Sequence, residues 1–169
     1  MLNISSLNNV QNLSAYVLAI LNKLEPILER LDAAKLDDSS EVEISNERGD
    51  WVLRLAIVPA DVNIPLLSLS ASSQYCILAF AEGEQIECHS NPEADESLVD
   101  MVVESSEKYL GGITVIESYN RNGKLIRKEC FFGMDAGNDE KSKIGTSSYF
   151  LVFPKKVYST KKKTFRFLK

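Results

Sequence analysis

The stretch that decides the fold is residues 113–131, which read ITVIESYNRNGKLIRKECF. Apolar and polar side chains alternate on both sides of the Asn120-Arg121-Asn122-Gly123 segment, and such alternation is typical of a strand with one buried face. An Asn-Gly pair between two alternating runs favours a tight reversal, because both residues tolerate positive φ. The sequence therefore predicts an antiparallel hairpin, which needs further strands and helices to cover it.

Two amphipathic helices are expected to pack on the sheet. In residues 7–35 the apolar side chains recur at intervals of three and four, which places them in one stripe along a helix. Pro26 removes one backbone hydrogen bond from this run and predicts a kink near Asn22 or Lys23. A second helix is predicted over residues 92–110, with Asn91-Pro92 at its start and Gly111-Gly112 at its end. Its predicted buried face consists of Ala94, Leu98, Met101, Val102, Ser105 and Tyr109.

Further strands and loops complete the predicted fold. Alternating patterns predict strands at 41–47, 51–58, 74–82 and 84–89, and a short strand at 149–153. Residues 59–65 and 133–146 are expected to be loops, the second of them mobile. These elements predict an α+β fold with a mainly antiparallel sheet, an N-terminal kinked helix and a second helix near residues 92–110. At 169 residues, we expect a single domain over residues 1–169.

Charge is divided unevenly along the chain. Residues 1–110 hold 19 Asp and Glu against 6 Lys and Arg, a net charge of −13, whereas residues 111–169 hold 5 against 13, a net charge of +8. Opposite surface fields of this kind act on association rate and choice of partner rather than on the fold. The division therefore predicts binding surfaces of opposite sign.

The second predicted helix carries acidic side chains opposite its apolar stripe. Like charges three or four residues apart repel by about 0.2–0.5 kcal/mol per pair. Such a face is either a solvated surface, helped near its start by the helix dipole, or an electronegative ridge for a basic partner. The acidic strand at 41–47, with Asp37 and Asp38 before it, extends the ridge. The candidate partner-binding residues are Glu93, Glu96, Asp100, Glu104, Glu107, Glu41 and Glu43.

The C-terminal segment, residues 155–169, is basic and has aromatic side chains between its cations. This pattern suits a phosphate backbone with stacked bases, whereas the sequence pI near 5.0 is far from that of typical nucleic-acid-binding domains. Lysines on an edge strand also prevent aggregation between sheets, and the segment is further able to pack beside the acidic part of its own chain. The candidate nucleic-acid-binding residues are Lys155, Lys156, Lys161, Lys162, Lys163 and Arg166.

The reactive residues give little indication of catalysis. Cys76, Cys88 and Cys130 are odd in number and far apart, which favours a reducing, cytoplasmic compartment over a disulfide framework. His89 is the single histidine, so a two-histidine zinc site is excluded, and alternation sends Cys88 and His89 to opposite faces of a strand. The sequence has no phosphate-binding glycine loop, dinucleotide fingerprint or nucleophile elbow. We therefore expect no enzyme, no metal site and no cofactor.

Membrane association is not expected either. The N-terminal residues lack the basic and apolar regions of a signal peptide. The most apolar stretch, residues 66–81, is interrupted by serines and falls short of the roughly 20 apolar residues that span a bilayer.

Residues 107–126, EKYLGGITVIESYNRNGKLI, resemble a pattern in small bacterial proteins. In that pattern a helix ending in Tyr-Leu-x-Gly is followed by a hairpin with an Asn-Gly-Lys turn. The type is similar to immunity proteins of polymorphic and contact-dependent growth inhibition toxin systems. The resemblance implies a non-catalytic protein that binds and blocks a cognate toxin, frequently a basic nuclease. It does not transfer binding residues, so the candidate positions depend on charge alone.

The expected function is therefore a cytoplasmic binding protein that neutralises a basic protein partner through an acidic surface. Two alternatives stay open. One is an acidic secretion-type chaperone for an effector protein, which needs an exposed apolar groove and usually a dimer. The other is nucleic-acid binding through the basic C-terminal segment.

Overall fold

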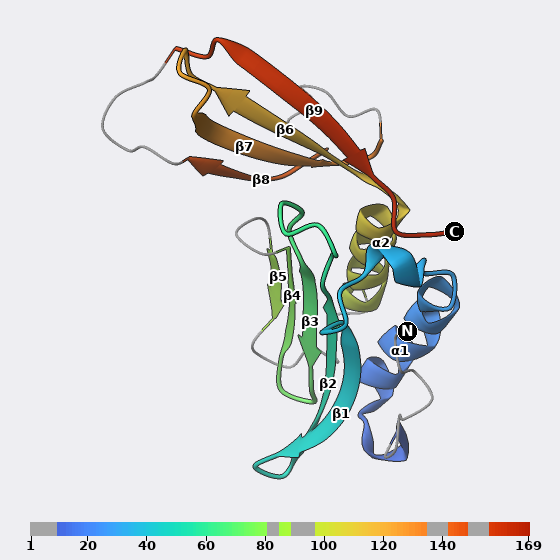
Figure 1. Ribbon diagram of the computed structural model, residues 1–169. Helices are drawn as coiled ribbons and strands as arrows, with labels where there is room; N and C mark the ends of the chain where they lie inside the picture. Colours follow the sequence, from blue (N-terminus) through green and yellow to red (C-terminus); the bar gives the residue numbers. More distant parts are fainter. Residues whose placement is uncertain (1–9, 81–84, 89–96, 135–141, 149–155) are drawn as a thin grey trace.

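The computed structural model describes residues 10–80, 85–88, 97–134, 142–148 and 156–169 (Figure 1). Within these ranges the chain forms two α-helices and two antiparallel sheets, which is the predicted α+β class. The strands are divided between a five-stranded and a four-stranded sheet, whereas the sequence suggested one main sheet. Periodicity marks the buried face of each strand, but tertiary packing decides which strands pair.

The five-stranded sheet follows chain order, so each strand pairs with the next along the sequence. Leu53, Leu55 and Ile57 on one strand and Leu67 and Leu69 on the next are buried in the core. The serines between Leu67 and Ala71 take the other face, and this strand was missed in the sequence analysis although it alternates. The strands are β1 (Glu41–Glu47), β2 (Asp50–Ile57), β3 (Leu67–Ala71), β4 (Cys76–Ala79) and β5 (Gln85–Cys88).

A two-residue turn joins β1 to β2, because Glu47 pairs directly with Asp50. Arg48 and Gly49 form the turn with φ values of 55° and 95°, the positive φ values that a type I′ turn requires. The Asn46 Oδ1 atom accepts a hydrogen bond of 3.1 Å from the Gly49 amide. Positive φ is sterically unfavourable for a residue with a Cβ atom, so the paired strands hold Arg48 in a strained conformation.

The two helices, α1 (Ala15–Leu28) and α2 (Leu98–Gly111), cover one face of the five-stranded sheet (Figure 1). The apolar stripe predicted for the first helix is buried. The Tyr16 hydroxyl fixes α1 to the β3–β4 connection, since it donates to the carbonyl oxygens of Ser72 and of Tyr75, the latter at 2.8 Å. The helix is shorter than the predicted 7–35.

The ends of the helices differ from the prediction for local reasons. The first helix ends two residues after Pro26, and the chain continues to a short 3-10 helix at Ala33–Lys35 that the Asp32 side chain caps through the Ala34 amide. The predicted starts, at residue 7 and at Asn91-Pro92, lie outside the described residues. On α2 the predicted core residue Met101 is 41% exposed, because the buried face follows Leu98, Val102, Ser106, Tyr109 and Leu110 instead.

The four-stranded sheet has the order β8-β7-β6-β9 and lies beyond the C-terminal end of α2 (Figure 1). Its central hairpin confirms the prediction, and the Asn120 Oδ1 atom accepts hydrogen bonds of 3.0 Å from the amides of Asn122 and Lys124 in the turn. The strands are β6 (Ile113–Tyr119), β7 (Leu125–Phe132), β8 (Lys143–Ser148) and β9 (Ser159–Phe165). Thus part of the basic C-terminal segment forms β9, which is an edge strand of this sheet among the described residues.

The predicted mobile loop at 133–146 is wrong in its last part. Residues 143–146 belong to β8, which pairs with β7, and Ile144 is 2% exposed within the core. The buried isoleucine explains why this polar stretch joins the sheet. The strand predicted at 149–153 lies outside the described residues.

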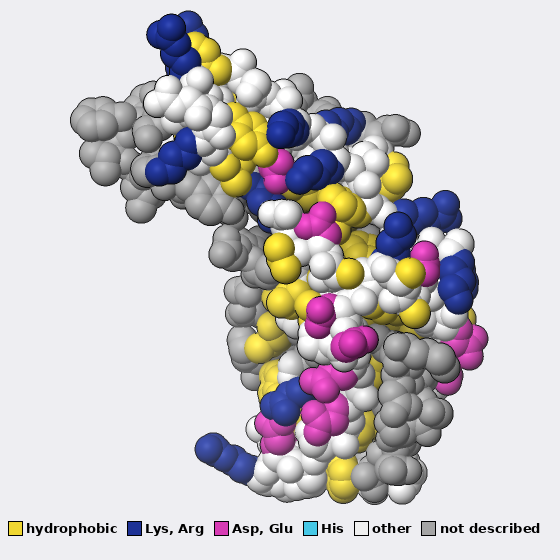
Figure 2. All heavy atoms as spheres, in the orientation of Figure 1, with side chains coloured by type: hydrophobic (Ala, Val, Ile, Leu, Met, Phe, Trp, Pro, Cys, Tyr) yellow, Lys and Arg dark blue, Asp and Glu magenta, His cyan; other side chains and the backbone are white. Residues whose placement is uncertain are grey.

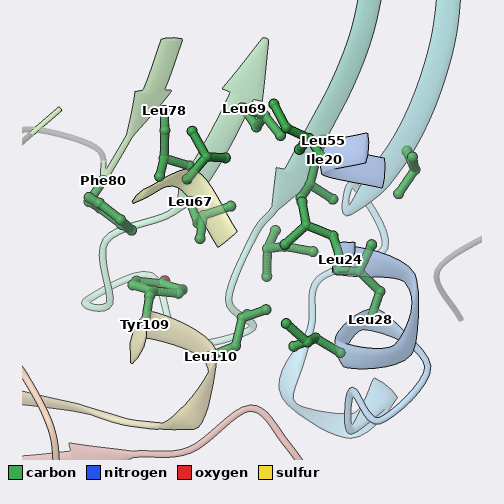
Figure 3. Packing of buried hydrophobic residues seen from close by; sticks show 14 of the residues in the cluster. Ile20, Leu24, Leu28, Leu55, Leu67, Leu69, Leu78, Phe80, Tyr109 and Leu110 are labelled. Atoms are coloured by element: carbon green, nitrogen blue, oxygen red, sulfur yellow. The ribbon is translucent and has the colours of Figure 1, made fainter. Parts of the chain in front are cut away.

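A cluster of aromatic rings joins the two sheets into one core. Tyr109 on α2 lies between Phe80, with ring centroids 5.5 Å apart, and Phe167, whose ring stacks on it at 5.1 Å. Figure 3 shows Tyr109 and Phe80 facing Leu67 and Leu78 of the five-stranded sheet. The chain end is tied by backbone hydrogen bonds, from the Phe167 amide to the Leu110 carbonyl oxygen at 3.1 Å and from the Asp32 amide to the Phe167 carbonyl oxygen at 2.7 Å. The last residues are therefore structural.

Candidate functional site

The division of charge along the sequence coincides with the division into two sheets. The acidic part of the chain builds the five-stranded sheet and both helices, and the basic part builds the four-stranded sheet. Figure 2 shows acidic side chains gathered over the lower sheet and lysines and arginines over the upper one. The two fields are thus fixed at opposite ends of the molecule, because each belongs to its own sheet.

On α2, two of the predicted partner-binding carboxylates are already paired within the chain. The Asp100 carboxylate forms an ion pair of 2.6 Å with the Lys23 ammonium of α1. Glu104 forms an ion pair of 2.7 Å with Lys108, one helical turn away. Glu107 is exposed. Exposed pairs of this kind contribute about 0–1 kcal/mol each, but they lower the net field of the helix. Glu93 and Glu96 lie outside the described residues.

On β1, the predicted residues Glu41 and Glu43 are exposed and form no ion pair with the described part of the chain. Glu43 lies opposite Arg54 in the β1–β2 register, but the Arg54 guanidinium binds the carboxylate of Glu47. Val42, between the two glutamates, is buried under the helices. Both carboxylates therefore point away from α1 and α2.

The structure thus separates the predicted acidic ridge into two surfaces. The β1 carboxylates lie on the open face of the five-stranded sheet, whereas α2 covers the other face. Asp37, predicted to extend the ridge, accepts hydrogen bonds from the Ser39 hydroxyl at 2.6 Å and the Ser39 amide at 3.0 Å, and these bonds lower the pKa of its carboxyl group. A partner cannot contact both surfaces through one flat interface.

In the four-stranded sheet, the acidic residues of the described part are neutralised internally. Glu117 is 4% exposed, accepts a 2.7 Å hydrogen bond from the Tyr119 hydroxyl and lies 3.3 Å from the Lys163 ammonium. The Tyr119 hydrogen bond, with the help of Lys163, lowers the Glu117 pKa in spite of burial. Glu129 is paired with Arg127 and, at 3.1 Å, with Lys143. The exposed charge of this sheet is consequently positive.

The exposed cations of this sheet come from more than the C-terminal segment. Lys161 lies 5.2 Å from the centroid of the Tyr119 ring, and Lys156 lies 5.8 Å from that of Tyr158. The β6–β7 hairpin adds cations that were not among the predicted residues, although the hairpin itself was predicted from the sequence. The exposed or half-exposed cations that the hairpin adds are Arg121, Lys124, Arg127 and Lys128. Of the predicted nucleic-acid residues, Lys155 lies outside the described part.

A cleft of about 410 Å³ lies where the two halves of the molecule meet. It is lined by the 3-10 helix at 33–35, by Asp61 of the β2–β3 loop and by the end of β9 with Arg166. The Asp61 carboxylate accepts hydrogen bonds from Asn63, which lower its pKa, with a smaller effect from the lysines of the four-stranded sheet. Acids held in turns, surface cations and apolar side chains together line the cleft.

Cys76 and Cys130 are both buried. Burial raises the pKa of the Cys130 thiol to about 11, which keeps it protonated near neutral pH. The β4–β5 register sets Cys88 opposite Cys76, although they are distant in sequence. His89 lies outside the described residues. Within the ranges that the structure describes, no group of three or more His, Cys, Asp or Glu side chains is placed to hold a metal ion.

No protein-family model, curated protein or solved structure matches the chain. Among the described residues, neither helix is long and apolar enough to cross a membrane.

Proposed function

We propose that the protein is a non-catalytic binding protein that neutralises a basic protein partner, and that Glu41 and Glu43 on β1 form the centre of the contact. The observation that supports this most directly is that both carboxylates are exposed and have no ion pair within the described part of the chain. The negative charge of a carboxylate without an ion pair inside the chain is not neutralised, so its whole electrostatic field acts on a partner. Such carboxylates therefore increase the association rate with a basic surface.

Glu107 on α2 is the alternative centre, since its neighbours Asp100 and Glu104 are already paired. The pairs are exposed, so a partner's cations can replace Lys23 and Lys108 with little loss. We favour β1 because binding there breaks no internal ion pair. The two surfaces lie on different sides of the sheet, so variants can separate them.

A toxin-immunity role is the specific form of this proposal, and a cytoplasmic location belongs to it. Support comes from the resemblance of residues 107–126, which form the end of α2, strand β6, the turn after it and the first two residues of β7. These residues lie outside the sheet that holds β1. The resemblance thus supports the type of protein, whereas the exposed charge supports the position of the binding surface. The chaperone alternative needs an exposed apolar groove and gains less support, because the large exposed apolar side chains of the described residues lie on four different segments. Val62 lies between β2 and β3, Met101 on α2, Met134 after β7, and the adjacent Val157 and Tyr158 before β9.

The test begins with capture from the native cell by the tagged full-length protein, eluted along a salt gradient. One basic protein released at moderate salt supports the proposal, since charge-driven contacts weaken as ionic strength rises. The association rate of that purified protein is then measured with Glu41→Lys/Glu43→Lys and with Glu104→Lys/Glu107→Lys, which change the net charge equally. A partner that is not basic, or whose binding is independent of salt, contradicts the proposal.

Nucleic-acid binding by the four-stranded sheet is a second candidate, favoured by the positive exposed charge of its described residues and by the two tyrosines beside Lys156 and Lys161. Deletion of the whole C-terminal segment cannot test it, since that removes the buried Phe167. Lys161→Gln/Lys162→Gln leaves the core intact. If the sheet binds single-stranded RNA, this variant lowers affinity and the slope of log K against log salt. Equal affinity of wild type and variant for a labelled oligonucleotide contradicts this candidate.

A further inference from the structure

The two sheets end in edge strands of opposite charge. Within the described part of the chain, β1 pairs with β2 alone and β9 pairs with β6 alone. Each edge strand has seven residues. The β1 edge carries Glu41 and Glu43, and the β9 edge carries three consecutive lysines, Lys161 to Lys163. An edge strand has unpaired backbone N–H and C=O groups that another strand can bind.

The charges prevent each edge from pairing with a copy of itself. Like charges directly opposite one another across two strands are destabilising, and lysines on an edge are a common device against aggregation. Strand β1 of one copy and β9 of another do not repel each other in this way, because their charges are opposite. The charge pattern therefore disfavours pairing of β1 with β1 and of β9 with β9, and it permits pairing of β1 with β9.

The spacing of the charges also matches. Glu41 and Glu43 are two residues apart and share one face of β1, and Lys161 and Lys163 are two residues apart and share one face of β9. An antiparallel arrangement with Glu41 opposite Lys163 brings Glu43 opposite Lys161. Lys163 already lies 3.3 Å from Glu117, but an ammonium group has three donors and can serve a second carboxylate.

We propose that the protein associates head to tail, with β1 of one copy added to β9 of a second copy. Such a contact is heterologous, so it continues into a chain or closes into a ring rather than stopping at a dimer. Because it uses the same two glutamates as the proposed partner site, self-association and partner binding exclude each other. The proposal goes beyond that function and does not depend on it, since no partner is needed.

Sedimentation velocity of the purified full-length protein, over a range of concentrations at low and at high salt, tests the proposal. We expect the mean mass to rise above 18.9 kDa with concentration at low salt and to return to it at high salt. Glu41→Lys/Glu43→Lys alone and Lys161→Glu/Lys162→Glu alone are each expected to associate at least about tenfold more weakly. Lys163 is left unchanged because it binds Glu117.

Mixing gives the decisive result. An equimolar mixture of the two variants has complementary edges again and should associate, whereas Glu104→Lys/Glu107→Lys, matched in charge but on α2, should behave as wild type. Circular dichroism checks that all variants are folded. A wild-type protein that stays at 18.9 kDa at every concentration in low salt overturns the proposal. So does a mixture that fails to associate, and neither result bears on capture of a basic partner.

Discussion

Replacement of Phe167 by alanine tests whether the C-terminal residues belong to the core. The ring is 1% exposed and stacks on Tyr109 with an interplanar angle of 14°. Removing a fully buried phenylalanine costs about 3–5 kcal/mol, since the transfer free energy is lost and a cavity remains. For a chain of this length, each kcal/mol lowers the melting temperature by roughly 2–4 °C. We therefore expect Phe167→Ala to melt roughly 6–20 °C below wild type.

Urea denaturation and thermal melting, both followed by far-UV circular dichroism, measure this effect. Lys169→Ala is the matched control, because the Lys169 side chain is exposed and its backbone amide keeps the 2.9 Å hydrogen bond to the Arg30 carbonyl oxygen. The control should change the free energy of unfolding by less than about 0.5 kcal/mol. A loss below about 1 kcal/mol for Phe167→Ala would refute the view that the chain end joins the two sheets.

Three further substitutions test local features. Arg48→Asn should raise the free energy of unfolding in urea by roughly 0.5–1 kcal/mol, because asparagine tolerates the positive φ of this turn better than arginine. An unchanged or lower free energy of unfolding would contradict the view that Arg48 is strained. Gly112→Ala should destabilise it by roughly 1–3 kcal/mol, because the residue has a φ of 151° and its Cβ atom would lie 2.7 Å from the Met134 sulfur. Adding Met134→Ala removes the contact with the sulfur but not the positive φ, so we expect the double variant to stay less stable than wild type. Full restoration of stability would contradict a contribution from the backbone. Glu117→Gln should cost about 1–2 kcal/mol at pH 7. The Tyr119 hydrogen bond lowers the Glu117 pKa, so this stability is complete above the ordinary carboxyl pKa of 4.5 and is lost as pH falls through the lower folded-state pKa. A difference from wild type that stays constant from pH 7 to pH 3 would contradict this assignment.

The parts of the fold that local pattern determines could be predicted from the sequence. The β6–β7 hairpin followed from the Asn-Gly turn, and the stripe on α1 followed from its three- and four-residue spacing. Strand β3 carried an equally clear alternation of leucine and serine, so the sequence contained the signal that was missed. The separation into two sheets could not be predicted, because pairing between distant strands depends on packing and not on periodicity.

The candidate site was predictable in composition but not in arrangement. The acidic residues of α2 and of β1 were expected to form one ridge, yet the sheet lies between them, since β1 turns Val42 toward the helices and its glutamates away. The pairing of Asp100 with Lys23 was also hidden, because these residues are 77 positions apart. Sequence alone shows how much charge a segment carries, and tertiary structure decides which charges remain available to a partner.

The most direct test of the central claim is the association rate of the captured basic partner with two charge-matched variants at low salt. If β1 is the binding surface, Glu41→Lys/Glu43→Lys lowers the rate at least about tenfold and flattens its salt dependence, while Glu104→Lys/Glu107→Lys stays within about a factor of two of wild type. The reverse order, or equal rates for both variants, would contradict the assignment of the binding surface to β1.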